Sequence, residues 1–439
     1  MSIESEIARI QNNIADSYLA CEEKGATLPV IQDSENLPAC ILSIPAGGVM
    51  RLQVACSGNT TWYLTKDGIL YGCGQNNYGQ QGSGGTTNVT TFSQRATGVK
   101  QVACSYSTTW YVTEDGTLYG CGRNNSGQQG SGDTTDVTTF TQRASGVKQV
   151  ACSSNATWYL TEDGTLYGCG NNYYGQQGSG TSGSGTHVTT FTQRATGVKQ
   201  IACSDYTTWY LTEDGTLYGC GWGGSGQQGS GDTTDVTTFT QRATGVKEVC
   251  CSDYTTWYLT EDDTLYGCGD SQYGQQGSGD TTNVTTFTQR ATGVKQVTCS
   301  YNTTWYLTED GTLYGCGSNN YGQQGSGTSG GSSNTSIFTQ RATGVKQIAC
   351  SQYTTWYLTE GGALYGCGYN AQGQQGSGTS TSGGISRFTE RASSVKQVFC
   401  SSATTWYTTQ SDVYGCGYNA QGQQGSGDTT NVLVFTKRN

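Results

Sequence analysis

Apolar and polar positions along this chain repeat as one unit, which is copied along almost its whole length. The copy at residues 207–221 reads TTWYLTEDGTLYGCG, with large apolar residues on both sides of a polar turn. Eight copies occur, and in each a tryptophan precedes the cysteine of Tyr-Gly-Cys-Gly by ten or eleven residues. The tryptophans are Trp62, Trp110, Trp158, Trp209, Trp257, Trp305, Trp356 and Trp406, and the cysteines are Cys73, Cys121, Cys169, Cys220, Cys268, Cys316, Cys367 and Cys416. The cysteines are 48 to 51 residues apart, a period typical of solenoids and propellers, whose units bury their apolar faces only against neighbours.

Each copy predicts four β-strands, because threonine, valine, tyrosine and tryptophan suit a pleated surface. In the fourth copy the strands are predicted at residues 198–203, 208–212, 216–220 and 236–241. Glu213-Asp214-Gly215 predicts a hairpin turn between the second and third strands. Trp209 and Tyr210 point to opposite faces of the sheet, so we expect both faces to be covered, as in stacked propeller blades.

We therefore predict an all-β fold, a single β-propeller of eight four-stranded blades over residues 46–439, preceded by a short α-helical segment over residues 1–45. A complete first strand begins the first copy at Val49, and a complete fourth strand at residues 434–437 ends the eighth. This favours eight blades. The alternative is seven blades, with one copy used for closure or docking.

Residues 1–45 lie outside the repeat. Ile3, Ile7, Ile10 and Ile14 follow the spacing of one helix face. The predicted helix either docks on the rest of the chain or forms a short coiled coil, which needs further contacts to be stable at this length. In the second case these isoleucines are oligomerisation residues, and we expect a homo-oligomer, with a trimer favoured.

Composition removes several classes of function. The chain has 22 basic and 32 acidic residues, a net charge of -10, which argues against nucleic acid as a partner because binding it requires clustered Lys and Arg. There is no apolar run of about 18 residues and no basic-then-apolar N-terminus, so we expect neither a membrane span nor a signal peptide.

Seventeen of the nineteen cysteines follow the repeat. Cysteines in the first and third strands of one sheet would lie about 9.6 Å apart, too far for a disulfide. We favour small buried apolar residues, with disulfides between neighbouring units as the alternative. Zinc is disfavoured because paired Cys-x-x-Cys motifs and histidines are lacking.

The repeat resembles that of the regulator of chromosome condensation family. In the fourth copy the matching residues are Val198, Ile201, Ala202, Leu211, Thr212, Asp214, Gly215, Tyr218, Gly221 and residues 226–231. The resemblance implies a β-propeller, usually of seven repeats. Two positions depart from the family pattern, since Thr207 replaces a histidine and Cys220 a tryptophan. Nucleotide exchange on a small GTPase and chromatin binding are known in that family, but the loops here carry no basic cluster, and fold alone does not imply function.

The N-terminal segment resembles the leader of tail-associated and fibre proteins of phages that infect Firmicutes. The resemblance rests on residues 5–10, 25–29 and 34–37. It implies attachment to a virion or tail-particle protein through residues 1–45.

We find no enzymatic site in the sequence, and we expect no cofactor or metal. His187 is the single histidine and is expected at the surface. The recurrent Glu-Asp pairs are better explained as turn formers than as acid/base carboxylates. Calcium at Asp133 with Asp136, or at Asp232 with Asp235, is disfavoured because no alternating ligand loop surrounds them. Gly-Gln-Gln-Gly-Ser-Gly lacks the lysine of a phosphate loop and predicts a tight structural corner.

The two sides of the predicted ring differ in sequence. One side carries the second-to-third and fourth-to-first connections, which recur almost unchanged between copies. On the other side, loops around the fixed Gly-Gln-Gln-Gly-Ser-Gly corner vary, using mainly Tyr, Ser, Asn and Gly with an occasional Trp or Arg. This is the composition of recognition loops on a rigid scaffold. The alternative is unconstrained drift, although drift would also yield Lys and Glu.

We predict that this varied side binds a ligand. The predicted face comprises Tyr78, Tyr106, Arg123, Tyr173, Tyr174, Asp205, Tyr206, Trp222, Asp253, Tyr254, Tyr273, Tyr301, Tyr321, Tyr353, Tyr369 and Tyr418. The leading hypothesis is a non-enzymatic adhesin of a phage or tail-like particle that binds a host-surface protein or glycan, with weak sites adding by avidity. It would be located on a virion or extracellular particle. The alternatives are a structural virion decoration protein without a specific ligand, and an intracellular propeller scaffold or exchange factor.

Overall fold

The computed structural model describes residues 52–438 of the chain. The chain divides into two compact units. The first is Met1–Leu52 with Thr65–Gly68, and its described part is a turn in which the Gly68 N–H donates to the Thr65 carbonyl. The second, Gln53–Leu64 with Ile69–Asn439, contains the strands discussed below. The predicted N-terminal helix, its isoleucines and Val49 lie outside the described residues.

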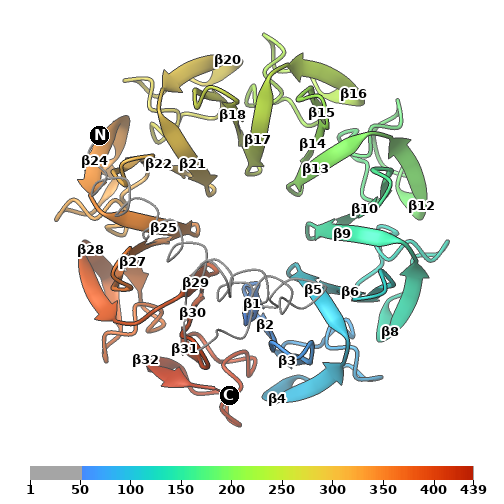
Figure 1. Cartoon of the computed structure of the whole chain (residues 1–439), viewed down its shortest axis with the longest axis horizontal. Helices are drawn as coiled ribbons and strands as arrows, with labels where there is room; N and C mark the ends of the chain where they lie inside the picture. Colours follow the sequence, from blue (N-terminus) through green and yellow to red (C-terminus); the bar gives the residue numbers. More distant parts are fainter. Residues whose placement is uncertain (1–51, 439) are drawn as a thin grey trace, which may run out of the picture. The chain divides into compact units, whose positions relative to one another are not determined.

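The second unit consists of eight antiparallel sheets, each made of four consecutive strands (Figure 1). The innermost strands are β1 (Gln53–Cys56), β5 (Val99–Cys104), β9 (Val147–Cys152), β13 (Val198–Cys203), β17 (Val246–Cys251), β21 (Val294–Cys299), β25 (Val345–Cys350) and β29 (Gln397–Cys400). The second strands are β2 (Thr60–Leu64), β6 (Thr108–Thr113), β10 (Ala156–Thr161), β14 (Thr207–Thr212), β18 (Thr255–Thr260), β22 (Thr303–Thr308), β26 (Thr354–Thr359) and β30 (Thr404–Thr408).

The third strands are β3 (Leu70–Gly74), β7 (Leu118–Gly122), β11 (Leu166–Gly170), β15 (Leu217–Gly221), β19 (Leu265–Gly269), β23 (Leu313–Gly317), β27 (Leu364–Asn370) and β31 (Val413–Gly417). The outermost strands are β4 (Val89–Ala96), β8 (Val137–Ala144), β12 (Val188–Ala195), β16 (Val236–Ala243), β20 (Val284–Ala291), β24 (Thr335–Ala342), β28 (Thr381–Ala392) and β32 (Val432–Lys437). A 3₁₀ turn, η1 (Gly331–Ser333), precedes β24. Within residues 52–438 no helix is long and apolar enough to cross a membrane.

The blade count is eight, as predicted, and the seven-blade alternative is wrong. Blade 1 is β1–β4 and blade 8 is β29–β32, so each is built from its own copy without exchanging a strand. The ring closes where blade 8 meets blade 1: β1 contacts β29 and β30, and Ser426 forms a β-bridge with Thr91. The predicted strands of the fourth copy agree with β13–β16 to within two residues.

The core lies between blades, because each sheet has two apolar faces. Trp158, Leu160 and Leu166 of blade 3 pack against Val198, Ile201 and Tyr210 of blade 4. Five other blade interfaces carry a cluster of the same kind. Burying one such side chain stabilises the fold by about 1.5–3 kcal/mol. Trp158 lies over its cross-strand partner Gly168, where an added Cβ would be 2.3 Å from the indole, so glycine makes room for the tryptophan.

The Gly-Gln-Gln-Gly-Ser-Gly corner joins each blade to the next, which confirms the predicted structural role. In blade 3, Gln177 Nε2 donates to the Cys169 carbonyl at 2.8 Å. The Cys220 thiol of blade 4 donates to the Gln176 carbonyl at 3.4 Å. Burial raises the pKa of Cys220 well above its usual value, so this thiol keeps the proton it donates. All eight third-strand cysteines are buried and bonded in this way.

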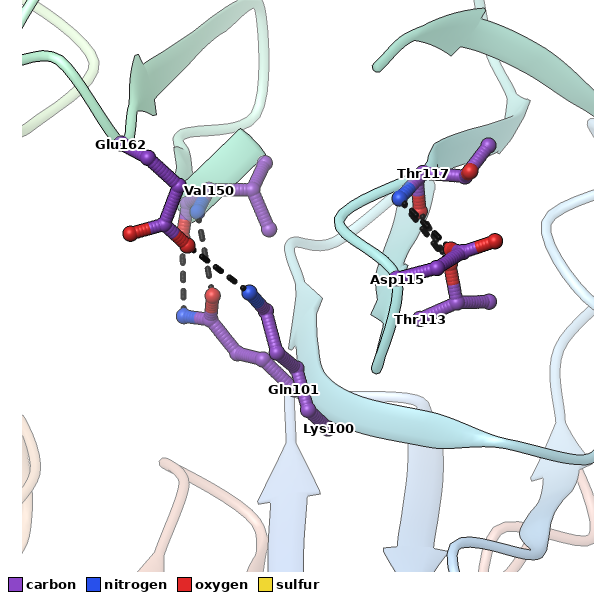
Figure 2. A network of polar contacts seen from close by, with 7 residues as sticks. All are labelled: Lys100, Gln101, Thr113, Asp115, Thr117, Val150 and Glu162. Atoms are coloured by element: carbon purple, nitrogen blue, oxygen red, sulfur yellow. Dashed lines mark hydrogen bonds and ion pairs between the residues drawn. The ribbon is translucent and has the colours of Figure 1, made fainter. Parts of the chain in front are cut away.

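The opposite edge of the ring is joined mainly through the backbone. The N–H of Val147, the first residue of β9, donates to the carbonyl of Gly116 in the preceding blade at 2.8 Å. Gln101 bonds both backbone groups of Val150 across the same interface, and Lys100 pairs with Glu162 at 3.3 Å (Figure 2). Asp115 accepts hydrogen bonds from the Thr113 hydroxyl and the Thr117 N–H, so it forms the turn, as predicted for the recurrent Glu-Asp pairs.

Candidate functional site

The variable loops of a blade lie on one side of the ring. We call this side the variable rim. It is formed by the loops between first and second strands and between third and fourth strands, which in blade 4 are residues 204–206 and 222–235. The constant rim is formed by the other two connections, in blade 4 residues 213–216 and 244–245. The rings of Tyr206 and Trp222, one from each variable loop, are 5.6 Å apart, so the two loops meet.

Six predicted aromatic residues form one continuous cluster across blades 3 to 6. We call Tyr173, Tyr174, Tyr206, Trp222, Tyr254 and Tyr301 the six-ring cluster. Tyr173 contacts Tyr174 with 4.9 Å between ring centroids, and Tyr174 contacts Tyr206 at 5.5 Å. Trp222 contacts Tyr254 at 5.5 Å, and Tyr254 contacts Tyr301 at 4.7 Å. The two hydroxyls of Tyr254 and Tyr301 are hydrogen-bonded at 2.9 Å.

The rings of the cluster meet mostly edge to face, an arrangement that stabilises aromatic pairs by about 0.5–1.5 kcal/mol. Tyr173 is 50% exposed, and the other five side chains are half-buried. The cluster is therefore held by its own contacts while part of each ring remains accessible. Such a surface is pre-organised for binding because little side-chain entropy is left to lose.

The remaining predicted aromatic residues are distributed around the same rim. Tyr321, Tyr353 and Tyr369 form a second cluster across blades 6 and 7, with centroid distances of 4.9 to 5.8 Å. The Arg123 guanidinium lies 5.1 Å from the Tyr78 ring centroid, within the range of a cation–π contact.

Three predicted residues stand apart from the clusters. Tyr106 is 49% exposed and its hydroxyl accepts a hydrogen bond from Asn59 Nδ2 at 3.0 Å. Tyr273 and Tyr418 lie in the third-to-fourth-strand loops of blades 5 and 8. Within residues 52–438 neither takes part in a ring-to-ring contact.

The two predicted carboxylates link neighbouring loops. Asp205 Oδ1 accepts the Ser154 N–H at 2.7 Å, and Asp253 Oδ1 accepts the Asp205 N–H at 3.0 Å. Burial, and next the charge of Asp205, raise the pKa of Asp253 to about 6. These bonds tie together the loops of blades 3, 4 and 5, which also carry residues of the six-ring cluster. The sequence showed two acidic loop residues, but not that their partners lie in the adjacent copy.

Part of the variable loop sequence is buried and structural. Asn172 has no exposed surface. Its Nδ2 donates to the Ser179 hydroxyl and the Thr181 carbonyl, and its Oδ1 accepts the Gln177 N–H. Equivalent bonds are made by Asn76, Asn124, Asn319, Asn370 and Asn419. These asparagines contributed to the recognition-like composition of the loops. At this position, however, they stabilise the loop and are not available to bind a ligand.

Loop acids considered for calcium also have local partners. Asp136 Oδ1 accepts the Asn124 N–H at 2.8 Å, and Asp235 Oδ1 accepts the Gly223 N–H at 3.0 Å. His187 occupies the equivalent place in blade 3, where Nδ1 accepts the Asn172 N–H at 3.4 Å. It is half-buried, so the expectation of a simple surface residue misses its role in closing the loop. Among residues 52–438, no group of three or more His, Cys, Asp or Glu side chains is placed to hold a metal ion.

A central cavity of about 580 Å³ lies among the innermost strands. Its lining includes first-strand cysteines, among them Cys56, Cys104, Cys152, Cys203 and Cys350. These thiols are only partly buried, unlike the third-strand cysteines. The repeat period showed that they recur, but only ring closure brings them around one cavity.

Comparison with known proteins gives a family match and shared folds. The model of the Regulator of chromosome condensation (RCC1) repeat matches residues 52–80, 99–128, 147–176, 198–227, 246–275, 294–323 and 345–374. Human WBSCR16 is 21% identical, with 76% of this chain and 96% of that chain covered and a TM-score of 0.61. Prp20p from Saccharomyces cerevisiae is 18% identical, with 75% and 87% covered and a TM-score of 0.59. Yeast RCC1 (Prp20), in its structure with Kap60, is 17% identical, with 73% of this chain and 83% of that chain covered and a TM-score of 0.59.

These likenesses show the fold and not the activity. No curated protein matches the chain. The eighth copy lies outside the seven matched segments, yet it forms the same four strands, β29–β32. The second unit is therefore an eight-bladed β-propeller, and seven of its eight copies match the RCC1 repeat model.

Proposed function

We propose that this propeller is a non-enzymatic binding scaffold that recognises a partner protein through its variable rim, with the six-ring cluster at the centre of the contact. The observation that carries the proposal is the continuity of the cluster. Six aromatic residues from five loops in four consecutive blades meet ring to ring. They occupy positions that vary between copies, so the fold does not require them.

The chemistry of the cluster suits a partner with cationic side chains. Aromatic ring faces attract Lys and Arg, and Tyr and Trp are the residues that most often dominate protein interfaces. Asp205 and Asp253 lie in the same loops, and the whole chain has a net charge of -10. Complementary charge raises association rates and disfavours acidic partners.

The comparisons favour a protein-binding scaffold over a virion adhesin. Prp20p, which shares the fold, binds Gsp1p and histones, and this supports a protein-binding role for the present propeller. The adhesin hypothesis, its host-surface ligand and its extracellular location remain predictions. The leader on which attachment to a particle depends, residues 1–45, lies outside the described residues.

Two matched tyrosines provide the test. Tyr173 and Tyr106 are equally exposed, at 50% and 49%, and both lie on the variable rim, but only Tyr173 belongs to the six-ring cluster. The experiment immobilises the full wild-type chain and three variants of it: Tyr173→Ser, Trp222→Ala and Tyr106→Ser. Each is used to capture proteins from a lysate of the cells of origin. The bound proteins are then quantified by mass spectrometry. Purified histones and intact bacterial cells serve as a cationic protein probe and an adhesin probe.

We expect at least one protein whose capture falls about tenfold or more with Trp222→Ala, the loss typical of an interface hot spot, and falls less with Tyr173→Ser. Its capture should be retained by Tyr106→Ser and weakened by salt. Capture that is the same for all three variants would refute the proposal. Binding to cells but to no soluble protein would instead support the adhesin hypothesis.

A further inference from the structure

We propose that Cys250 and Cys299 are a redox-active pair that forms a disulfide between blades 5 and 6. Their Sγ atoms are 3.3 Å apart. A disulfide bond is about 2.05 Å long, so the sulfur atoms need to approach by roughly 1.3 Å. Small side-chain rotations on two neighbouring strands can supply that distance.

The pair arises from one departure in the repeat. Cys250 occupies the position before the last residue of its innermost strand, where five other copies carry alanine: Ala55, Ala103, Ala151, Ala202 and Ala349. Its side chain faces blade 6, since Cys250 packs with Cys299 at that interface. Cys299 belongs to the ring of first-strand cysteines present in every copy. Six of the other interfaces place Ala or Thr opposite this cysteine and the seventh places Phe399, so within residues 52–438 only blades 5 and 6 bring two thiols together across this position.

The same interface differs from its neighbours in a second way. In blade 2, the Gln101 side chain bonds both the N–H and the carbonyl of Val150 in the next blade. Gln200 and Gln347 bond the carbonyls of Val249 and Val398 in the same manner. In blade 5 this residue is Glu248, and an ionised carboxylate cannot donate to a carbonyl. The interface that carries the thiol pair therefore has a carboxylate where the other copies have an amide, and a disulfide there would add a covalent link between the two blades.

Geometry and environment allow oxidation. Both cysteines are partly exposed. Thr298, the residue next to Cys299, lines the central cavity, which a small oxidant can enter. The hydrogen bond with Cys299 lowers the pKa of Cys250, with burial opposing it, and either thiol can donate in this bond. A thiolate is the reactive form of cysteine.

Hydrogen peroxide can serve as the oxidant. The Cys250 thiolate attacks one peroxide oxygen, an S–O bond forms as the O–O bond breaks, and the released hydroxide takes a proton to become water. The Cys299 thiolate then attacks the sulfenic sulfur, and the S–S bond forms as hydroxide leaves and is protonated. Two thiols and one peroxide thus yield one disulfide and two waters, with two electrons passing from sulfur to oxygen.

The test uses the full chain, fully reduced and then treated with hydrogen peroxide or, separately, with diamide. Remaining thiols are alkylated in denaturant, and the chain is digested without reductant for mass spectrometry. We expect one dominant cross-linked peptide pair containing Cys250 and Cys299. The oxidised protein should also unfold about 2–5 °C higher than the reduced protein, because the bond closes a loop of about 50 residues in the unfolded chain.

Two variants complete the test. Cys250→Ala carries the residue found in five other copies, so it should fold normally, give no such cross-link and show no oxidation-dependent shift in unfolding temperature. Cys251→Ala removes the adjacent first-strand cysteine and should retain both effects. If both thiols remain alkylatable after either oxidant, or if Cys251 supplies the cross-link, the proposal is wrong.

Discussion

The two rims of this propeller are built from the same eight copies but use their side chains differently. On the constant rim, contacts between blades run mainly through the backbone, as from Val147 N–H to the Gly116 carbonyl, and the side chains form the turns themselves. On the variable rim, fixed anchors leave short stretches of varied sequence between them. In blade 4, Ser204 Oγ accepts the Thr207 N–H, so the loop is anchored on both sides of residues 205 and 206. The difference shows that a rim can vary in sequence when its anchors are separate from its exposed positions.

The largest effect expected from this comparison comes from a pair of glycines. Gly178 in a variable-rim corner and Gly197 on the constant rim have φ angles of 63° and 68°. A Cβ on Gly178 would lie 2.4 Å from the Phe239 ring of the next blade, whereas a Cβ on Gly197 would meet nothing within 4 Å. We expect Gly178→Ala to cost about 2–5 kcal/mol, from left-handed strain plus overpacking, and Gly197→Ala about 1 kcal/mol. Urea unfolding measures both, and equal losses would contradict the assignment of the corner as an inter-blade contact.

The next effect is a pH dependence of opposite sign on the two rims. The folded pKa of Asp253 is raised from 3.8 to about 6, mainly by burial, so its contribution to stability is present below pH 4 and lost as pH rises through 6. The free energy of unfolding that is lost in this way is at most about 3 kcal/mol. The stability of the wild type relative to Asp253→Asn should therefore fall between pH 4 and pH 7.

Asp163 on the constant rim provides the matched control. The Thr161 hydroxyl, followed by other hydrogen bonds, lowers the pKa of this carboxylate. Its contribution is present above the unfolded pKa and lost as pH falls, so the stability of the wild type relative to Asp163→Asn should decrease on acidification. Unfolding curves over a pH series measure how the stability difference from the wild type changes with pH for each variant. If the two differences change in the same direction, the predicted contrast between the two rims is wrong.

A smaller effect is expected for Gln101, near the constant rim. Gln101→Ala leaves the N–H and carbonyl of Val150 without their side-chain partner, which should cost about 1–2 kcal/mol. Glu248→Gln should stabilise the interface between blades 5 and 6 by about 1 kcal/mol, because the amide can donate to the next blade. Chemical unfolding measures the free energy of unfolding of both variants. A Glu248→Gln variant less stable than the wild type would show that residue 248 of blade 5 is not equivalent to Gln101 of blade 2.

The smallest effect is expected for the Lys100–Glu162 ion pair (Figure 2). Glu162 is 63% exposed, and exposed pairs contribute about 0–1 kcal/mol. Lys100→Ala should change the free energy of unfolding by less than about 0.5 kcal/mol, and high salt should abolish the difference. A loss as large as that of Gln101→Ala would mean that this rim depends on charge and not on backbone bonds.

Much of the fold could be predicted because each element depends on local chemistry. Glu213-Asp214-Gly215 predicts a turn from its residue types alone, and the alternation around Trp209 predicts a sheet covered on both faces. The fixed corner could be recognised as structural because its glycines recur in every copy. Which side of the ring each loop occupies followed from the up-and-down order of strands.

The candidate site could be predicted only in part. The sequence identified Tyr206, Trp222 and Tyr254 as rim residues, but not the ring-to-ring cluster that they form, since these contacts cross from one blade to the next. It did not distinguish buried Asn172 from exposed Tyr173, because adjacent loop positions point in different directions once the loop closes.

The sequence by itself determined the repeat, the strands, the turns and the division into a constant and a variable rim, because these depend on residue type and spacing within one copy. Only the tertiary structure decided what happens between copies. It placed Asp205 on the Ser154 amide, joined six aromatic rings across four blades and brought Cys250 to Cys299. The physical reason is that residues about 50 positions apart become neighbours only when one blade packs on the next.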